Sequence, residues 1–398
     1  MAKLNPFYLM ASLYFVLDVA AIALVALVTA GIISPIAGLN WIQVHLLTIG
    51  VVTQAIFGTL PRLVVRARDD TLLRARITWA TWFLVNGGFA TLLVSMPAGQ
   101  SSIAAGGALA IFSAVALMLV GLRTRGSGKL AVTRASLLFY LSGPVFFLIG
   151  ISMALSMLLG WSAPGGFFGI LEAHVHANVW GFLALVVAGV LIDRIPVSLG
   201  QPLRFPGVVP ATAWLLIVGA IGLVVGPWAA ILPLTILGIS VYVVGTALLL
   251  ANLIGTALTA RGWTPNLTHL LVAYVWMVVP AVAAPLIVFV TGQLPTSHVE
   301  AAAVAGLVAG WILQIVIGAF VPGLVRGDHG AVTGNGSWLS VLALNLGVLL
   351  FWISPLFAER AVASVTAVGY TLIVVGLLPP LASLLRQVVA SPVSVGHV

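Results

Sequence analysis

Of the 398 residues in the chain, 62% are hydrophobic and only 6% are charged. Soluble proteins carry about a quarter charged residues, so a soluble protein is excluded and the composition predicts an all-α, polytopic membrane protein. Because there is no cysteine, disulfides, thiolate-held iron–sulfur clusters and covalently attached c-type haem are excluded too, and any metal must be held by His, Asp, Glu or a cofactor.

Apolar stretches of about 20 residues, the length that crosses the hydrocarbon core, predict about twelve transmembrane helices in one transmembrane domain over residues 1–398. We expect no separate soluble domain, and no cleaved signal peptide because the first apolar run is long. The predicted spans cover residues 8–34, 41–62, 77–97, 101–122, 136–160, 174–192, 208–226, 229–253, 267–291, 299–322, 337–357 and 362–385.

The basic residues predict the orientation, because Lys and Arg are retained on the cytoplasmic side of a membrane. Of the 16 Lys and Arg, all except Arg360 fall at the N-terminus, at the C-terminus or in loops on one side of the predicted spans. We therefore expect a multi-pass protein of the cell (plasma) membrane, in contact with lipid and with both termini cytoplasmic. The net charge of +8 is then a topology signal, and no nucleic-acid partner is expected.

An internal repeat links three of the spans. The pattern His-x4-Gly-x7-Gly occurs in span 2 and again in span 6, and part of it recurs in span 10. The matched residues are His45, Gly50, Gln54 and Gly58 in span 2, His176, Gly181 and Gly189 in span 6, and Gly310, Gln314 and Gly318 in span 10. Since each is the second span of a group of four, we predict a pseudo-threefold arrangement of four-helix units, at about 8–122, 136–253 and 267–386.

Four histidines are predicted to lie at one depth, near the outer boundary of the membrane. These are His45 in span 2, His174 and His176 in span 6, and His298 in span 10. Neutral imidazole is a good ligand for iron, copper and zinc, so the set predicts metal binding. The alternative is that these are interfacial side chains bonded to loop backbone.

Helix geometry limits the pair in span 6. Residues two apart on a helix point about 200° away from each other, so His174 and His176 cannot both face the bundle axis if both are helical. Either the helix starts near Ala177, or only one of them is a ligand. Glu172 lies four residues before His176 and shares its face, which would let it orient the His176 ring.

Two other ionisable residues allow less specific predictions of their role. His269 opens span 9 near the cytoplasmic surface, where it is either an interfacial histidine or, with Tyr274 and Trp276, part of a separate inner site. Glu300 follows His298 by two residues and is a further candidate ligand.

Asp18 lies inside span 1, where an unpaired carboxylate is costly. It is either part of a proton path or a protonated acid bonded to Tyr14 or to a buried amide. Four other polar residues inside spans are expected to tie helices together; they are Gln54, Asn86, Gln314 and Asn345.

Twelve spans in groups of four, with histidines at the outer ends of spans 2, 6 and 10, resemble the haem–copper oxidase subunit I superfamily. Within it, the stretches Thr268–Trp276 and Ala188–Pro196 and the span with His298 are similar to the small NnrS-type haem- and copper-containing membrane proteins. The resemblance implies haem ligation by His45 and His298, and a copper-type site at His176 with His174.

The departures from that family are informative. Span 7 contains no histidine where the respiratory oxidases carry a His–His pair, span 10 has one histidine instead of two, and Trp180 stands where a cross-linked tyrosine is found. A complete oxygen-reducing binuclear centre is therefore not expected.

The resemblance implies a membrane redox or gas-responsive protein that binds haem b, with copper as a further metal, linked to nitric oxide or denitrification metabolism or stress. We expect an external electron donor or a partner subunit to supply its electrons. If the protein is an enzyme, the resemblance implies an oxidoreductase of the haem–copper or nitric oxide type. The alternative is a proton-coupled transporter or metal-ion permease without a redox cofactor, with the outer histidines as a loading site and Asp18 as the coupled acid.

Overall fold

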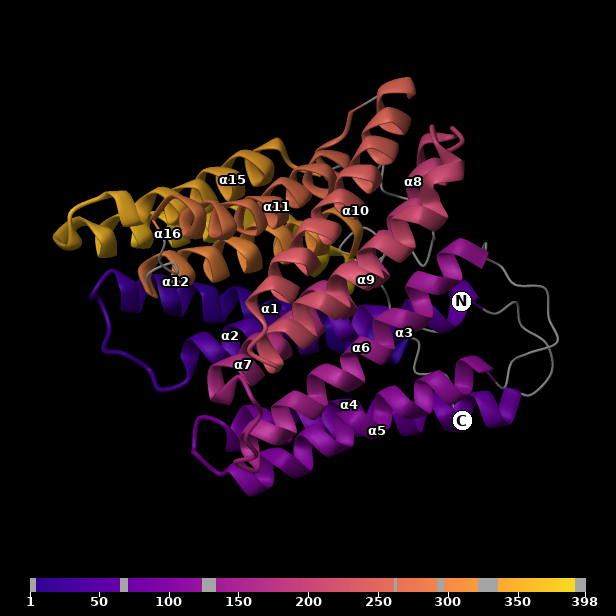
Figure 1. Ribbon diagram of the computed structural model, residues 1–398, viewed down its shortest axis with the longest axis horizontal. Coiled ribbons are helices and arrows are strands. Elements are labelled where there is room, and N and C mark those ends of the chain that lie inside the picture. Colours follow the sequence, from indigo (N-terminus) through magenta and orange to yellow (C-terminus); the bar gives the residue numbers. More distant parts are fainter. Residues whose placement is uncertain are drawn as a thin grey trace. The chain divides into compact units, whose positions relative to one another are not determined.

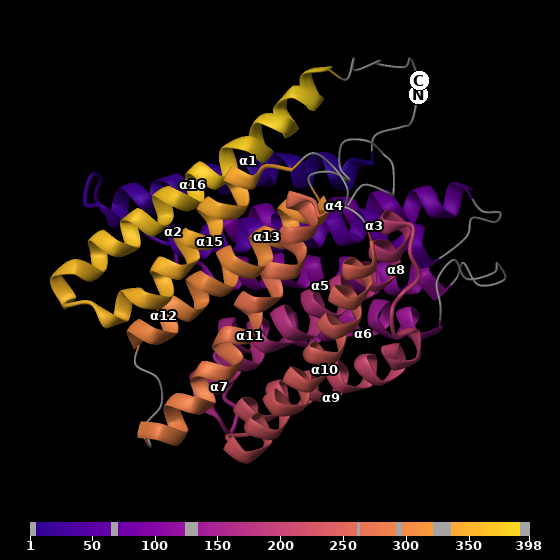
Figure 2. The same cartoon turned by 90° about the horizontal axis from the view of Figure 1, so that it is seen from above.

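The computed structural model describes residues 5–64, 71–123, 134–260, 263–291, 297–320 and 336–390. Within these ranges there is no β-strand, and 12 helices are long and apolar enough to cross a membrane. Figures 1 and 2 show the resulting all-helical protein. The predicted fold class, a polytopic helical membrane protein with twelve spans, is confirmed.

Several spans are built from more than one helical segment. In chain order the segments are α1 (Pro6–Thr29), α2 (Leu39–His45), η1 (Leu46–Thr53), α3 (Gln54–Val64), α4 (Thr71–Ser95), α5 (Ser101–Arg123), α6 (Arg134–Leu158), α7 (Gly166–His176), η2 (Ala177–Leu183), α8 (Ala184–Leu199), η3 (Pro206–Val208), α9 (Val209–Trp228), α10 (Leu232–Thr259), α11 (Pro265–Thr291), α12 (Ser297–Gly306), η4 (Leu307–Ile312), α13 (Leu313–Ile315), η5 (Val316–Phe320), α15 (Trp338–Ile353), η6 (Ser354–Leu356) and α16 (Glu359–Ala390).

The contacts divide the chain into two compact units. Unit 1 comprises Met1–Leu4, Tyr8–Val51 and Arg261–Val398, and unit 2 comprises Asn5–Phe7 and Val52–Ala260. Span 2 therefore starts in unit 1 and continues in unit 2. The predicted division into three four-helix units remains a prediction.

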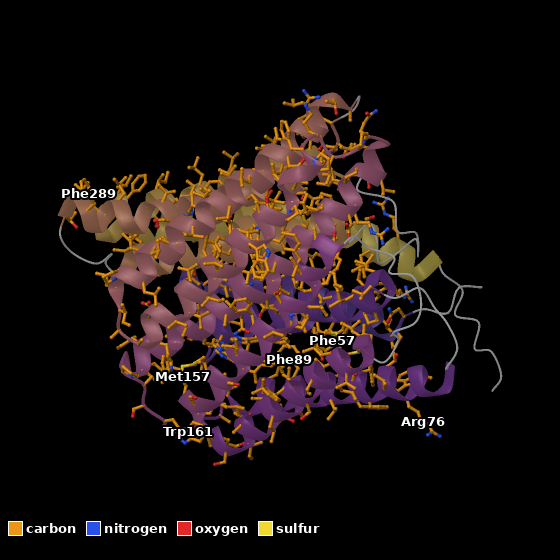
Figure 3. The ribbon with its side chains drawn as sticks, turned by 45° about the vertical axis from the view of Figure 1, so that its right-hand side comes forward. Phe57, Arg76, Phe89, Met157, Trp161 and Phe289 are labelled. Carbon is orange, nitrogen blue, oxygen red and sulfur yellow. The ribbon has the colours of Figure 1, made fainter. Side chains whose placement is uncertain are left out.

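Small residues bring neighbouring helices of unit 2 close together. A Cβ atom added to Gly222 in α9 would lie 2.7 Å from the Cα atom of Gly238 in α10, and one added to Gly88 in α4 would lie 2.6 Å from the carbonyl oxygen of Gly107 in α5. Such close approach of backbones is how membrane helices gain packing energy without a hydrophobic drive between them. Figure 1 shows α4 beside α5, and Figure 3 shows Phe57 and Phe89, both buried, inside this unit.

Unit 1 uses the same device between α15 and α16, which run side by side in Figures 1 and 2. A Cβ atom on Gly347 would lie 2.7 Å from the carbonyl oxygen of Gly369. The packing of this helical hairpin therefore depends on two glycines that face each other.

Spans 2, 6 and 10 differ from the other nine in backbone and burial. Each contains a π-helical segment, namely η1 in span 2, η2 in span 6, and η4 and η5 in span 10. They are also the most buried of the described spans: 61%, 72% and 78% of an 18-residue apolar stretch of each is buried, against at most 56% for any other span. Because π-helical segments are rare and often occur at functional sites, these three spans are the candidates for carrying a functional site.

The glutamines matched by the repeat in spans 2 and 10 make equivalent contacts: each donates a hydrogen bond to an asparagine of the following span. The Gln54 side-chain amide donates to Asn86 Oδ1 over 2.8 Å in unit 2, and the Gln314 amide donates to Asn345 Oδ1 over 3.2 Å in unit 1. The prediction that these four amides tie helices together is confirmed. A Cβ atom on Gly310 would likewise lie 2.7 Å from Trp276 of the preceding span.

Span 6 starts earlier than predicted. The α7 helix begins at Gly166, eight residues before the predicted start at residue 174. The polar run from Glu172 to His176 predicts a membrane boundary, but a helix can extend beyond the boundary of the membrane, and here it does. The added turns pack against the end of α9, where the Gly165 backbone N–H donates to the Trp228 carbonyl over 2.9 Å.

Candidate metal and cofactor site

The imidazole of His45 is held in one orientation at the end of α2. Its Nδ1 lies 2.8 Å from the carbonyl oxygen of Trp41, one turn earlier, and its ring stacks on the Trp41 ring with centroids 4.0 Å apart and planes at 22°. A carbonyl oxygen only accepts, so Nδ1 carries the proton and Nε2 carries the lone pair. Metal-bound histidines are commonly oriented by such a bond from the other ring nitrogen to a backbone carbonyl.

His174 and His176 point to different helices. Both belong to α7, so they obey the predicted 200° separation. His174 Nδ1 lies 2.8 Å from the Gly150 carbonyl of α6, whereas His176 lies against the Leu223 backbone of α9. The two rings therefore do not face a common site. The helix does not start near Ala177, which was one of the two predicted cases.

His176 is the better placed of the two for a ligand. Its Nδ1 is buried and has no hydrogen-bond partner within the described part of the chain. Glu172 lies one turn earlier on α7 and is exposed, and its role in orienting the His176 ring stays a prediction. His174 is already engaged, because its Nδ1 lies 2.8 Å from the Gly150 carbonyl oxygen and Asn178 Nδ2 lies 3.2 Å from Nδ1 and 3.4 Å from Nε2.

The predictions for His298 and Glu300 fall on side chains outside the described residues, although their backbone lies in α12. Among the side chains that the structure describes, no three His, Asp or Glu residues come together as a metal cluster. A metal held by fewer protein ligands, or brought by a cofactor, needs no such cluster.

His269 belongs to a polar network of unit 1. It is fully buried, and its Nδ1 lies 3.0 Å from Gln314 Oε1. Gln314 is bonded to Asn345, which in turn accepts a 2.6 Å hydrogen bond from the Trp276 ring nitrogen. The predicted neighbour Trp276 thus belongs to the same network, while Tyr274 has a buried hydroxyl with no partner in the described residues.

Asp18 is fully buried in α1. Its Oδ1 accepts a 3.2 Å hydrogen bond from the side-chain amide of Gln43 in α2, and its Oδ2 has no partner among the described residues. Of the partners predicted for this acid, a buried amide is the one observed.

Two residues of these sites were not singled out from the sequence. Trp41 could have been found, because it lies one helical turn before His45 and therefore shares its face. Gln43 is 25 positions from Asp18, and only the packing of α1 on α2 brings it to the acid.

Neither of two comparisons with known proteins finds a relative of this chain. No protein-family model matches the sequence, and a search of curated proteins finds no match. The site is therefore interpreted from its own geometry.

Proposed function

We propose that the protein is a haem-binding integral membrane protein of the haem–copper oxidase type, in which His45 Nε2 is an iron ligand. The orientation of His45 carries the proposal. Its Nδ1 donates to the Trp41 carbonyl at 2.8 Å, so the lone pair that could bind a metal is on Nε2.

The surroundings of His45 suit a flat cofactor. The ring is only half-buried, and it already stacks on an aromatic plane, that of Trp41. The π-helical segment η1 begins at the next residue, Leu46. An extra residue in a helical turn is a frequent feature of functional sites, and His176 precedes η2 in the same way.

His298 is the proposed second iron ligand, and His176 the proposed ligand of a separate metal, with copper as the candidate. Bound haem would supply one-electron chemistry or gas binding. Ligation by two histidines favours electron transfer, and a single histidine leaves a position for a gas such as nitric oxide. In either case an external electron donor or partner subunit would be required for turnover.

The test is the optical spectrum of the protein purified from cells with adequate haem supply, first air-oxidised and then reduced with dithionite. We expect a Soret band that shifts on reduction, at about one haem per chain. A transporter or permease without a redox cofactor predicts no such band. Absence of the band after purification and after incubation with added haemin would refute the proposal.

A further inference from the structure

A cavity of about 320 Å³ lies within unit 1, between α1, α2, the α12–η4–α13 span and α16. Its walls consist mainly of small and branched apolar side chains, with three polar ones. The lining residues used below are Ile22, Asn40, Gln43, Val44, Ala305 and Tyr370. The volume is at the lower end of the range found for small-molecule sites, about 300–1,000 Å³.

The cavity is separate from the proposed haem ligand. It is lined by Asn40, Gln43 and Val44 of α2, whereas His45 stacks on Trp41. Successive residues of a helix are rotated by about 100°, which places Trp41 and His45 on a different side of α2 from the cavity. A molecule in the cavity therefore would not compete for His45.

A carboxyl group lies directly behind the cavity wall. Gln43 both lines the cavity and donates its side-chain N–H to Asp18 Oδ1 over 3.2 Å. Ile22, one turn after Asp18 on α1, lines the cavity too. Asp18 itself is fully buried and is not one of the lining residues; its Oδ2 is unpartnered in the described part of the chain, and Gln43 connects the acid to the cavity.

A carboxylate buried without a positive partner is costly, and in membrane proteins such groups are paired, protonated or part of a binding site. The acid therefore stays neutral until a cation reaches it. The walls do not suit a hard divalent cation such as Ca²⁺ or Mg²⁺, because such ions take six or more oxygen ligands and most of the lining is apolar. An organic ammonium group needs only a few acceptors, and its hydrocarbon part matches the remaining walls.

We propose that this cavity binds a small amphipathic amine in its protonated form. The ammonium group takes the place of the Gln43 N–H as the donor to Asp18 and also donates to the amide oxygens of Gln43 or Asn40, while the apolar part packs on residues such as Val44 and Ala305. On binding, the proton of Asp18 leaves to solvent, so the acid exchanges a proton for the ammonium ion. The proposal does not rest on haem binding, and each can fail without the other.

The test uses two probes of equal shape, 1-naphthylmethylamine and the neutral 1-naphthylmethanol, titrated into the purified full-length protein at neutral pH. Naphthalene fluorescence reports binding. We expect saturable binding of the amine, at least tenfold tighter than that of the alcohol. In the Asp18→Asn protein the affinity for the amine should fall to that for the alcohol, while the affinity for the alcohol stays the same. Asp193→Asn is the control, because Asp193 bonds to Ser136 and Tyr140 in unit 2 and should leave both affinities unaltered.

Three results would overturn the proposal: equal affinity for both probes, unchanged amine binding in Asp18→Asn, or unchanged binding of both probes in Ala305→Phe, which fills the cavity. Wild-type protein with carboxyl-¹³C aspartate supplies a measurement that does not depend on the variants folding. Its infrared spectrum should lose a protonated-carboxyl band when the amine is added, and a spectrum without that loss contradicts the exchange.

Discussion

Replacement of His45 by alanine is expected to reduce haem in the purified protein to less than a tenth of the wild-type content. The reason is that Nε2 of this ring is the proposed iron ligand, with the ring orientation set by the 2.8 Å bond of Nδ1 to Trp41 and by stacking on its indole. Haem content and Soret absorbance, measured on equal amounts of folded protein, give the result.

Loss of haem alone would not separate ligation from a structural role, so the His45→Ala protein should also be given free imidazole. Imidazole that occupies the vacated position restores a six- or five-coordinate haem spectrum if His45 is a ligand. A structural defect is not repaired in this way. His174→Ala is the matched control, since its ring is engaged by Gly150 and Asn178, and it should retain haem. Full haem content in His45→Ala would show that the assignment is wrong.

The second large effect concerns packing in unit 2. Gly222→Ala is expected to lower the free energy of unfolding by about 1–3 kcal/mol, the range typical of overpacked sites. The new Cβ atom would meet the Gly238 backbone, whose Cα lies 2.7 Å away, so α9 and α10 must move apart. The unfolding midpoint in a denaturant titration of the detergent-solubilised protein measures the change.

Gly87→Ala is the matched control for this prediction. Gly87 is also in a helix of unit 2 but is exposed, and a Cβ atom there would have no neighbour within 4 Å. Alanine has a higher helix propensity than glycine by about 1 kcal/mol, so this variant should be neutral or slightly more stable. Equal destabilisation by both substitutions would contradict the packing argument.

Much of the fold was predictable, because crossing a bilayer requires long apolar runs that can be read directly from the sequence. The twelve spans follow from that constraint, and the cost of unpaired polar groups predicts that amides such as Gln54 and Asn86 tie helices together, but not which amides pair. The divergence of His174 and His176 also follows from helix geometry alone. The early start of α7 at Gly166 was missed, since a polar stretch at a membrane boundary resembles a helix end.

The parts of the site that depend on tertiary packing could not be predicted. A π-helical segment such as η1 shifts the hydrogen bonds of the backbone by one residue and leaves no clear mark in composition. The pairing of Asp18 with Gln43 required two helices to meet at one register. The cavity that Gln43 lines involves four spans, and no pattern within one span indicates it.

The proposed function depends on the binding of iron by an imidazole nitrogen of His45. It is tested most directly by electron paramagnetic resonance of the ferric protein carrying ¹⁵N-labelled histidine, with hyperfine detection of nitrogen coupled to the iron. The proposal predicts ¹⁵N couplings from both proposed ligands, His45 and His298, in the wild-type protein; one of the two is lost in His45→Ala and is replaced by a ¹⁴N coupling when unlabelled imidazole is added. Couplings that all persist unchanged in the His45→Ala protein, or iron with no histidine coupling in the wild type, would contradict it.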